Sequence, residues 1–536
     1  MSSTSISSRT SSQQPAGPNG ELSHQQILVI VGGLMAGMLL SALDQSIVGT
    51  ALPRIVSDLG GLNHLSWVVT AYLLTSTAAT PLWGKISDLY GRRLIFQMTI
   101  VIFLIGSALC GLAQNMPQLI AFRAFQGIGG GGLMAIAFAI IGDVIPPRER
   151  GRYQGYFFAV FGLSSVAGPL LGGWITDTFD WRWIFYINLP IGAVALVVTS
   201  IALKMPVVRR DHKIDYVGAA MIVAGVTSLL LYLNWAGEKY GWLSSASLWL
   251  VGLAILFTVL FILVEFRAEE PIIPMHLFRN PIFAVGNTYS FLIGFAMFGG
   301  LIYLPLYFQT VQGMSPTRSG LAMLPMVLGL FTMSITAGQL ISRTGKYKIY
   351  PIIGSVILIL GFYLLHTIHY NTAYWQIAIY AVVLGAGVGL SMSTVVTPIQ
   401  NSVAMQDMGS ATSTNTFLRS LGGAIGAALF GAILTSQLGH YLTQEFAGTA
   451  AGAGTKIDAN SVQAIRTLPE PIKTQVLIAY THAVTDIFLY AIPIMVLSFV
   501  VIIFFKEIPL RATQIVAQPE GDPENSQTSE PVFAGH

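Results

Sequence analysis

The sequence predicts an all-α polytopic membrane protein of fourteen spanning helices, arranged as two six-helix halves with two additional helices between them. Three observations lead to this prediction. Hydrophobic residues make up 53% of the 536 residues and charged residues only 10%, against about 25% charged residues in soluble domains. Mean hydropathy is +0.67. Apolar runs of bilayer length follow one another along the chain, and one polar loop sequence occurs twice. This combination is typical of helical membrane proteins.

Each predicted helix is an apolar run of roughly twenty residues, the length that crosses a bilayer as an α-helix. The runs lie near residues 27–51, 66–86, 94–113, 118–141, 153–176, 183–203, 216–235, 246–265, 283–307, 319–342, 349–369, 374–398, 411–436 and 478–505. Pro81 and Pro169 lie inside two of them, which membrane helices tolerate because neighbouring groups satisfy the freed carbonyls. An even number of crossings places both termini on one side.

Basic residues indicate which side that is. The loops on the side of the termini carry fifteen Lys and Arg residues, and the loops on the other side carry seven. By the positive-inside rule, both termini are expected in the cytoplasm. Residues 1–25 and 511–536 are expected to be disordered cytoplasmic tails because they are polar and lack an apolar core, and residues 438–474 a long mobile outer loop. The single cysteine, Cys110, leaves no disulfide to form.

The loop sequence that occurs twice indicates an internal repeat. GKISDLYGRR, residues 84–93, recurs as GQLISRTGKY, residues 338–347, and both glycines of the first copy have a counterpart in the second. Each copy follows the second helix of a half. The predicted domains are therefore an N-terminal half at 26–204, two additional central helices at 216–265 and a C-terminal half at 281–505. Parallel repeats of this kind are common in alternating-access transporters. Ser342 stands where the first copy has Asp88, so the two loops cannot share one charge role.

Asp44 is the most informative candidate residue. It lies in an otherwise uncharged run from Ile27 to Pro53 that is long enough to cross the membrane. A carboxylate at that depth costs roughly 2.5–3.5 kcal/mol on insertion scales, so it normally faces the protein interior. Gly33, Gly37 and Ser41 recur with it at helical spacing, a stripe of small residues suited to helix contact. Asp44 is expected to bind and release protons. A structural acid bonded to a neighbouring hydroxyl or arginine is the alternative.

Arg123 is expected at a depth similar to that of Asp44. At 1.5 Å per residue, Arg123 lies roughly 9 Å and Asp44 roughly 11 Å from the outer ends of their predicted helices. A nearby guanidinium would keep Asp44 ionised, whereas a dry apolar surrounding would keep it protonated. Movement between those two environments would couple transport to protons. A permanent structural ion pair is the alternative.

Three further charged residues lie in or at the ends of predicted helices. Asp486 stands one turn from His482 in the last helix. A local structural pair is the favoured interpretation, and a second proton relay is the alternative. Arg419, near the start of the run at 411–436, is expected to snorkel to the inner interface. Glu265 is expected at the same interface.

The motifs resemble those of the major facilitator superfamily. The first loop copy is similar to its cytoplasmic loop signature, and the fourteen predicted helices are similar to its drug:proton antiporter branch. The further matching segments are ALDQSIVGTALP (42–53), RAFQGIGGGG (123–132), GLSSVAGPLLGG (162–173), WRWIFYINLPIG (181–192), PIIPMHLFRN (271–280) and GLAMLP (320–325). The resemblance covers about residues 27–510. It implies the major facilitator fold and proton-coupled antiport.

The resemblance also implies a conformational switch. In the first loop copy, two glycines allow a tight turn and three charged residues latch the halves: Gly84, Asp88, Gly91, Arg92 and Arg93. In the fifth helix, small residues and a proline allow close packing and rocking: Gly168, Pro169, Gly172 and Gly173. The alternatives are a generic charged loop in the first case and a packing face without a role in transport direction in the second.

The predicted function is export of small lipophilic or cationic organic compounds, that is multidrug efflux, across the cell membrane by alternating access. Inward proton flow would supply the energy, so no cofactor is expected. The expected partners are the small-molecule substrate, protons and the lipid bilayer, without nucleic acid, and the protein is expected to be monomeric. Substrate-cavity candidates are six aromatic residues, suited to flat lipophilic or cationic molecules, and one amide: Trp67, Tyr72, Gln126, Phe161, Tyr289, Phe295 and Tyr303.

Three other functions remain open at this point. They are export of an endogenous lipid, siderophore or amino acid by the same fold, a passive channel, and a membrane enzyme. The enzyme is disfavoured because no catalytic constellation is found. GIGGGG, residues 127–132, lies inside a predicted helix with no strand before it, so it is not a nucleotide-binding loop. No Walker lysine motif supports ATP-driven transport.

Overall fold

The protein is an all-helical bundle in the computed structural model, which describes residues 24–59, 65–203, 215–236, 240–445, 469–470 and 472–510; no strand occurs within these ranges. The N-terminal half consists of α1 (His24–Leu59), α2 (Leu65–Tyr90), α3 (Arg92–Gly111), α4 (Met116–Val144), α5 (Pro147–Thr178), α6 (Trp183–Tyr186) and α7 (Asn188–Ala202). The two additional helices are α8 (Tyr216–Trp235) and α9 (Ser245–Glu265).

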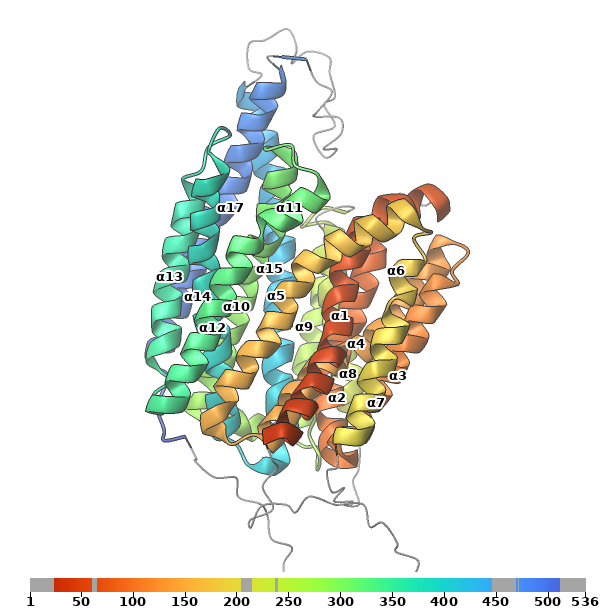
Figure 1. Ribbon diagram of the computed structural model, residues 1–536, viewed down its shortest axis with the longest axis vertical. Helices are drawn as coiled ribbons and strands as arrows, with labels where there is room; N and C mark the ends of the chain where they lie inside the picture. The colour runs from red at the N-terminus through yellow and green to blue at the C-terminus, as the bar shows by residue number, and fades with distance from the viewer. Residues whose placement is uncertain are drawn as a thin grey trace, which may run out of the picture.

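The C-terminal half begins after the short turn η3 (Met275–Arg279). It consists of α10 (Pro281–Thr310), α11 (Pro316–Ala322), α12 (Leu324–Thr344), α13 (Ile349–His366), α14 (Tyr374–Asn401), the turn η4 (Met405–Asp407), α15 (Met408–Glu445) and α17 (Ile472–Ile503). The start of α1 and the end of α17 lie at the same end of the bundle (Figure 1), which we call the terminal end. The opposite end is the distal end.

Thirteen segments of the described chain are long and apolar enough to cross a membrane. The helix α2, 26 residues long, is the fourteenth of spanning length. Threonines and serines recur along it, and several of them face the space between the halves. The all-α polytopic fold predicted from the sequence is the fold observed.

The two halves pack as matched bundles that meet along two pairs of helices (Figure 1). The pair α2 and α15 joins the second helix of the N-terminal half to the fifth helix of the C-terminal half. The pair α5 and α12 makes the reciprocal contact. The two copies of the repeated loop lie at the terminal ends of α2 and α12. The repeat therefore marks equivalent positions of an approximate two-fold arrangement.

The additional helices cover one side of this interface. The helix α8 packs on both α2 and α15, whereas α9 packs on α8. Large apolar side chains such as Ile255, Leu256 and Val259 are exposed on α9. In a membrane, this face of α9 would contact lipid.

The ends of the last two long helices differ from the predicted boundaries. The helix α15 continues through Glu445, and α17 begins at Ile472. Residues 438–445 and 472–474, predicted to belong to the long loop, are therefore helical. The rest of that loop at 446–468 and 471, and the predicted tails at 1–23 and 511–536, lie outside the described residues.

Candidate functional site

A fully buried carboxylate, Asp44, lies in the middle of α1 with both oxygens bonded. Its Oδ2 pairs with Arg123 Nη1 at 2.5 Å. Its Oδ1 accepts hydrogen bonds from Gln126 Nε2 at 3.0 Å and Asn188 Nδ2 at 3.1 Å. Part of the predicted stripe of small residues packs closely on α3, because a Cβ on Gly37 would meet the ring of Phe96. Asp44 and Arg123 are thus brought into direct contact inside the N-terminal half.

Arg123 is held in place from several directions. Its Nε donates to Val68 O at 3.2 Å, and its Nη1 also donates to Gln126 Oε1 at 2.8 Å. The guanidinium lies over the Tyr72 ring, 4.4 Å from its centroid. Glycines of the GIGGGG segment allow this packing, because a Cβ on Gly130 would collide with the Tyr72 hydroxyl. The GIGGGG segment therefore allows α4 to pack closely against α2.

A short chain of contacts connects the ion pair to the space between the halves. The Tyr72 hydroxyl lies 2.9 Å from Ser41 Oγ. Ser41 and its neighbour Gln45 line the central cavity described next. The ion pair is therefore buried, yet only one tyrosine and one serine separate it from the cavity.

Sequence analysis missed two members of this cluster. Asn188 bridges Asp44 and Ser107, donating to Ser107 Oγ at 3.0 Å. Ser107 in turn donates to Phe185 O at 2.8 Å. A signal was present, since Asn188 is the one amide side chain in the apolar stretch WIFYINLPIG.

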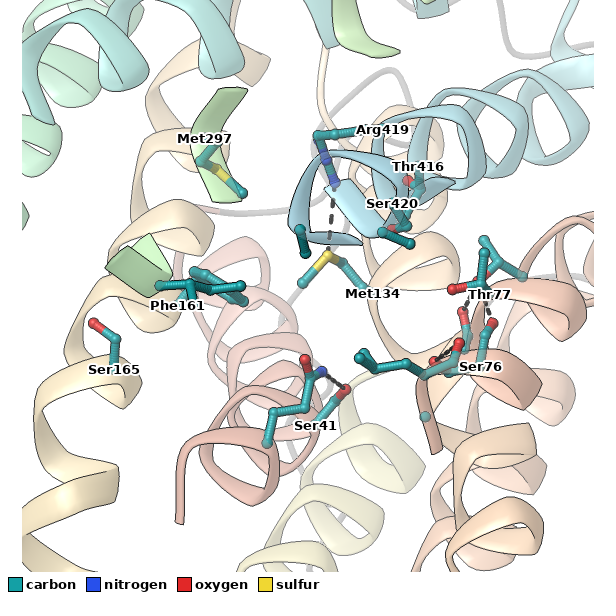
Figure 2. Close-up of a pocket in the computed structure, with 18 of the residues that line it drawn as sticks. Ser41, Ser76, Thr77, Met134, Phe161, Ser165, Met297, Thr416, Arg419 and Ser420 are labelled. Atoms are coloured by element: carbon teal, nitrogen blue, oxygen red, sulfur yellow. Dashed lines mark hydrogen bonds between the residues drawn. The ribbon is translucent and has the colours of Figure 1, made fainter. Parts of the chain in front are cut away.

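A central cavity of about 500 Å³ lies between the halves (Figure 2). Helices α1, α2, α4 and α5 line it from one side, α10, α12, α14 and α15 from the other, and α8 closes part of its edge. Its apolar wall is rich in methionine and phenylalanine: Met38, Met134, Met297, Met326, Met392, Phe138, Phe157 and Phe161. Hydroxyl groups from Ser41, Thr70, Ser76, Thr77, Thr80, Ser165, Thr416, Ser420 and Thr435 are interspersed. Flexible methionines suit a cavity that adapts to ligands of different shape.

Of the seven residues predicted to line a substrate cavity, Phe161 alone belongs to the described lining. Tyr72 and Gln126 hold the ion pair instead. Trp67 packs edge-on against Trp235, with ring centroids 5.7 Å apart. The remaining three face the interior of the C-terminal half. Tyr289 binds Pro351 O and Ser355 Oγ, both at 3.0 Å, while Phe295 and Tyr303 pack against Phe430.

At the terminal end, Asp88 reaches from α2 to the other half. Its carboxylate accepts hydrogen bonds from the backbone N–H groups of Gly409, at 3.0 Å, and Ser410, at 2.7 Å. These are free donors in the first turn of α15, so Asp88 caps a helix of the opposite half. Arg92 pairs with Asp88 at 2.5 Å and with Asp143 at 2.6 Å. Among the charged residues predicted to latch the halves, Asp88 makes the contact between them and Arg92 orients it.

The other predicted switch residues have different roles. Arg93 donates to Ser200 O at 2.8 Å within the N-terminal half, so it contacts α7 and not the opposite half. Gly91 has a positive φ of 95° at the turn between α2 and α3, which favours glycine. Gly84 allows α2 to approach α15, because a Cβ there would collide with Ser413.

The second loop copy contributes a close glycine contact to the reciprocal pair of helices. A Cβ on Gly338 of α12 would collide with the backbone of Gly151 on α5. Beside this contact, Thr397 donates to Gln154 Oε1 at 3.1 Å, and Gln154 donates to Gln400 Oε1 at 3.4 Å. The two halves are therefore in tight contact below the cavity at the terminal end.

The predicted glycines of α5 pack against two different neighbours. Gly168 and Gly172 face Ser46 and Thr50 of α1, where a Cβ would collide with either hydroxyl. Pro169 and Gly173 instead face α11: a Cβ on Gly320 would lie 3.3 Å from Pro169, and one on Gly173 would lie 3.5 Å from Thr317 Oγ1. The segment thus combines packing inside its own half with contact to the other half near the distal end.

Asp486 lies far from the ion pair in the fold. It accepts a hydrogen bond from the Tyr441 hydroxyl of α15 at 2.9 Å, and His482 packs against the same tyrosine ring at 5.3 Å. Glu265, at the end of α9, is buried and accepts hydrogen bonds from the N–H groups of Ile272 and Ile273. Both acids serve local contacts.

Arg419 differs from its predicted position. It lies eleven residues beyond Met408, the first residue of α15, or about 16 Å along the helix. It is 7% exposed, lines the cavity, and directs Nη2 toward Met134 Sδ at 3.7 Å. The prediction that it snorkels to the inner interface is therefore wrong.

Two six-helix bundles face one another across an apolar cavity that two equivalent helix pairs, α2–α15 and α5–α12, close at one end. This arrangement defines a membrane transporter of two repeated halves. The chain belongs to the Major Facilitator Superfamily, whose family profile matches residues 34–427. It is a transporter and not an enzyme.

Named relatives agree with this assignment. The Multidrug transporter protein MdtP of Bacillus subtilis (strain 168) is 41% identical over 417 residues, which cover 78% of this chain and 77% of that protein. Multidrug resistance protein 3 of the same organism is 38% identical over 495 residues, covering 90% and 96%. Among solved structures, the human organic anion transporter MFSD10 (TETRAN) gives a TM-score of 0.60 at 15% identity, covering 89% of this chain and 99% of that one. The structural likeness shows the fold alone.

Proposed function

We propose that this protein exports small lipophilic organic compounds from the cytoplasm in exchange for protons, by alternating access of the central cavity. The observation that carries the proposal is the Asp44–Arg123 ion pair, fully buried and separated from the cavity by Tyr72 and Ser41. A buried carboxylate that can be reached from a substrate cavity is suited to taking up a proton on one side of the membrane and releasing it on the other.

The physical basis of coupling is the neutralisation of Asp44. Protonation removes the negative charge of Asp44 that holds Arg123, so the guanidinium can bind another acceptor. Because Asp44 belongs to α1, Arg123 to α4 and Asn188 to α7, the loss of this pair changes how three helices of one half pack. Ser41, one turn before Asp44, would carry that change to the cavity wall.

The driving force is sufficient without ATP. One proton moving inward across 100 mV supplies about 2.3 kcal/mol before any pH gradient is counted. We place the protein in the cell membrane. From the distribution of basic residues, we place both termini in the cytoplasm. The terminal end is then the cytoplasmic end, and the closed contacts there belong to a state in which the cavity is shut to the cytoplasm.

The proposed range of substrates follows from the cavity wall and from the relatives. Methionines and phenylalanines dominate the lining, and two relatives at 38% and 41% identity carry the name of multidrug proteins. The described lining contains no aspartate or glutamate. A cationic substrate, expected from the sequence, would find no carboxylate in that part of the wall.

The test is transport by the purified protein in proteoliposomes with an imposed pH gradient. A fluorescent lipophilic compound should accumulate against its gradient only when the proton gradient is present, and Asp44→Asn should abolish this accumulation. Accumulation that continues after the gradient is collapsed by an ionophore would contradict proton coupling. Flux that only dissipates the substrate gradient, without saturation and without proton movement, would indicate a channel.

A further inference from the structure

The position of Arg419 in the cavity is not explained by proton coupling. It projects from α15 across the gap toward α4, where its guanidinium approaches Met134 and lies 6.0 Å from the centroid of the Phe138 ring (Figure 2). It is 7% exposed. A cation at this depth of a membrane protein is costly, and residues of this kind usually mark a pathway for ions or substrates.

Close packing of α15 against α10 fixes the direction of this side chain. A Cβ on Gly294 of α10 would collide with the Arg419 carbonyl, and a Cβ on Gly422 or Gly426 of α15 would collide with α10 carbonyls. The helices therefore touch backbone to backbone along that face of α15. Another face of α15, with Thr416, Ser420 and the alanines that follow, lines the cavity.

The described lining of the cavity carries a positive charge. Arg419 is the charged residue of the lining, and the part of the chain that the structure describes adds no acidic side chain to that lining. The nearest buried acid of the proposed coupling device, Asp44, has both oxygens bonded within its own half. A cationic ligand would meet repulsion in this wall, whereas an anionic ligand would meet a planar donor group with several N–H bonds.

We infer that Arg419 is a specificity-determining residue that binds the carboxylate or sulfonate group of amphiphilic organic anions. The apolar body of such a ligand would lie against Met134, Phe138 and Phe161, and the hydroxyls of Thr416 and Ser420 stand beside the anion site. This inference rests on the proposed function insofar as the cavity is the transport cavity. It narrows the substrate class from lipophilic compounds in general to lipophilic acids.

A matched pair of probes tests the inference by binding alone. The full-length protein in detergent is titrated into a fluorescent diethylaminocoumarin carboxylate, and separately into the corresponding carboxamide, which has the same rings without the charge. The wild type should bind the carboxylate more tightly. Arg419→Gln should weaken carboxylate binding about tenfold or more, as expected for loss of a charge-assisted hydrogen bond, and change carboxamide binding less than about twofold.

Two further variants keep the result interpretable. Arg419→Lys retains the positive charge without the planar donor group, so a reduced preference for the carboxylate should remain. Arg343→Gln, which removes an exposed positive charge near the end of α12, should leave both affinities unchanged. If Arg419→Gln fails to fold, the preference of the wild type for the carboxylate and the affinities of Arg419→Lys still test the inference. Equal wild-type affinity for both probes, or equal losses for both in Arg419→Gln, would overturn the inference.

This experiment separates the two proposals. Binding is measured without any gradient, so the carboxylate preference can persist even if proton-driven export is absent, and then only the coupling proposal fails. If export is proton-driven but no probe depends on Arg419, only the anion site fails. A transport readout adds a second test. Export of an anion in exchange for an inward proton moves two charges in the same sense, so a potassium diffusion potential should accelerate carboxylate export more than carboxamide export.

Discussion

The Asp44 carboxylate and the Arg123 guanidinium neutralise each other inside the N-terminal half, where both are at most 1% exposed. Removing one member of such a buried pair leaves an uncompensated charge, whereas removing both leaves a neutral polar site. Gln126 and Asn188 hold the carboxylate from two other helix positions. This arrangement allows stability and proton coupling to be measured separately.

We expect Asp44→Asn to lose proton-driven export and also to lower the free energy of unfolding by about 3–5 kcal/mol, since Arg123 is left buried and unpaired. The double variant Asp44→Asn, Arg123→Gln should recover most of that stability and remain uncoupled. Thermal unfolding of the purified variants and substrate-induced proton release report the two properties. Recovery of proton release in the double variant would remove Asp44 from the mechanism.

At the scale of helices, the cap that Asp88 places on α15 joins elements of opposite halves. The two first-turn N–H groups that it binds have no partner inside their own helix. In the reciprocal pair, α5 and α12, Ser342 stands at the position that corresponds to Asp88. Closure at the terminal end thus includes a carboxylate cap on one side and close packing of Gly338 against Gly151 on the other.

Asp88→Asn should weaken this closure while leaving substrate affinity near that of the wild type. Loss of part of a helix cap costs about 0.5–2 kcal/mol, so the closed arrangement should lose several-fold in population. The single native cysteine, Cys110, is buried, and a Cys110→Ser background permits site-specific labelling. Ser413→Cys, at the contact of α15 with Gly84, should then react faster with a maleimide when Asp88→Asn is present. Unchanged labelling, together with unchanged turnover, would contradict the role of the cap.

Gly338→Ala should slow transport by obstructing the contact between α12 and α5. The added methyl group would collide with the backbone of Gly151, and overpacking of this kind costs about 1–3 kcal/mol. Gly252→Ala is the matched control, because a Cβ at Gly252 meets nothing within 4 Å. Initial transport rates at saturating substrate compare the two, and equal rates would show that the closed contact is not required for turnover.

For the molecule as a whole, the architecture was accessible from the sequence because it depends on local quantities. Run length predicts spanning helices, and the repeated loop predicts two halves. The rotation of each helix about its own axis, in contrast, does not depend on local sequence alone. Tyr289 and Tyr303 face the inside of their own half because packing against neighbouring helices sets the rotation. Arg419 was misplaced for a related reason: its side chain points into the cavity toward Met134 of α4, a direction set by how α15 packs between the halves.

A cross-link between the halves should arrest the transport cycle. A Cβ on Gly155 of α5 would lie 3.4 Å from the Cα of Ile335 on α12, a spacing compatible with a disulfide. In the Cys110→Ser background, oxidation of the Gly155→Cys, Ile335→Cys pair should abolish transport, and dithiothreitol should restore it. The Gly155→Cys single variant controls for oxidation. Full transport by quantitatively cross-linked protein would show that these helices stay together throughout the cycle.

The cap on α15 also has a consequence for the cell. When the halves part at the terminal end, the N–H groups of Gly409 and Ser410 lose the Asp88 oxygens and must bind water instead. Opening then replaces the Asp88 carboxylate by water as the acceptor for these N–H groups. The equilibrium between the closed and open arrangements therefore depends on water activity. Osmolytes that are excluded from protein surfaces favour the closed arrangement, because it exposes less protein surface to water. Osmotic stress would therefore slow export through the hydration of one helix end, without any regulatory ligand.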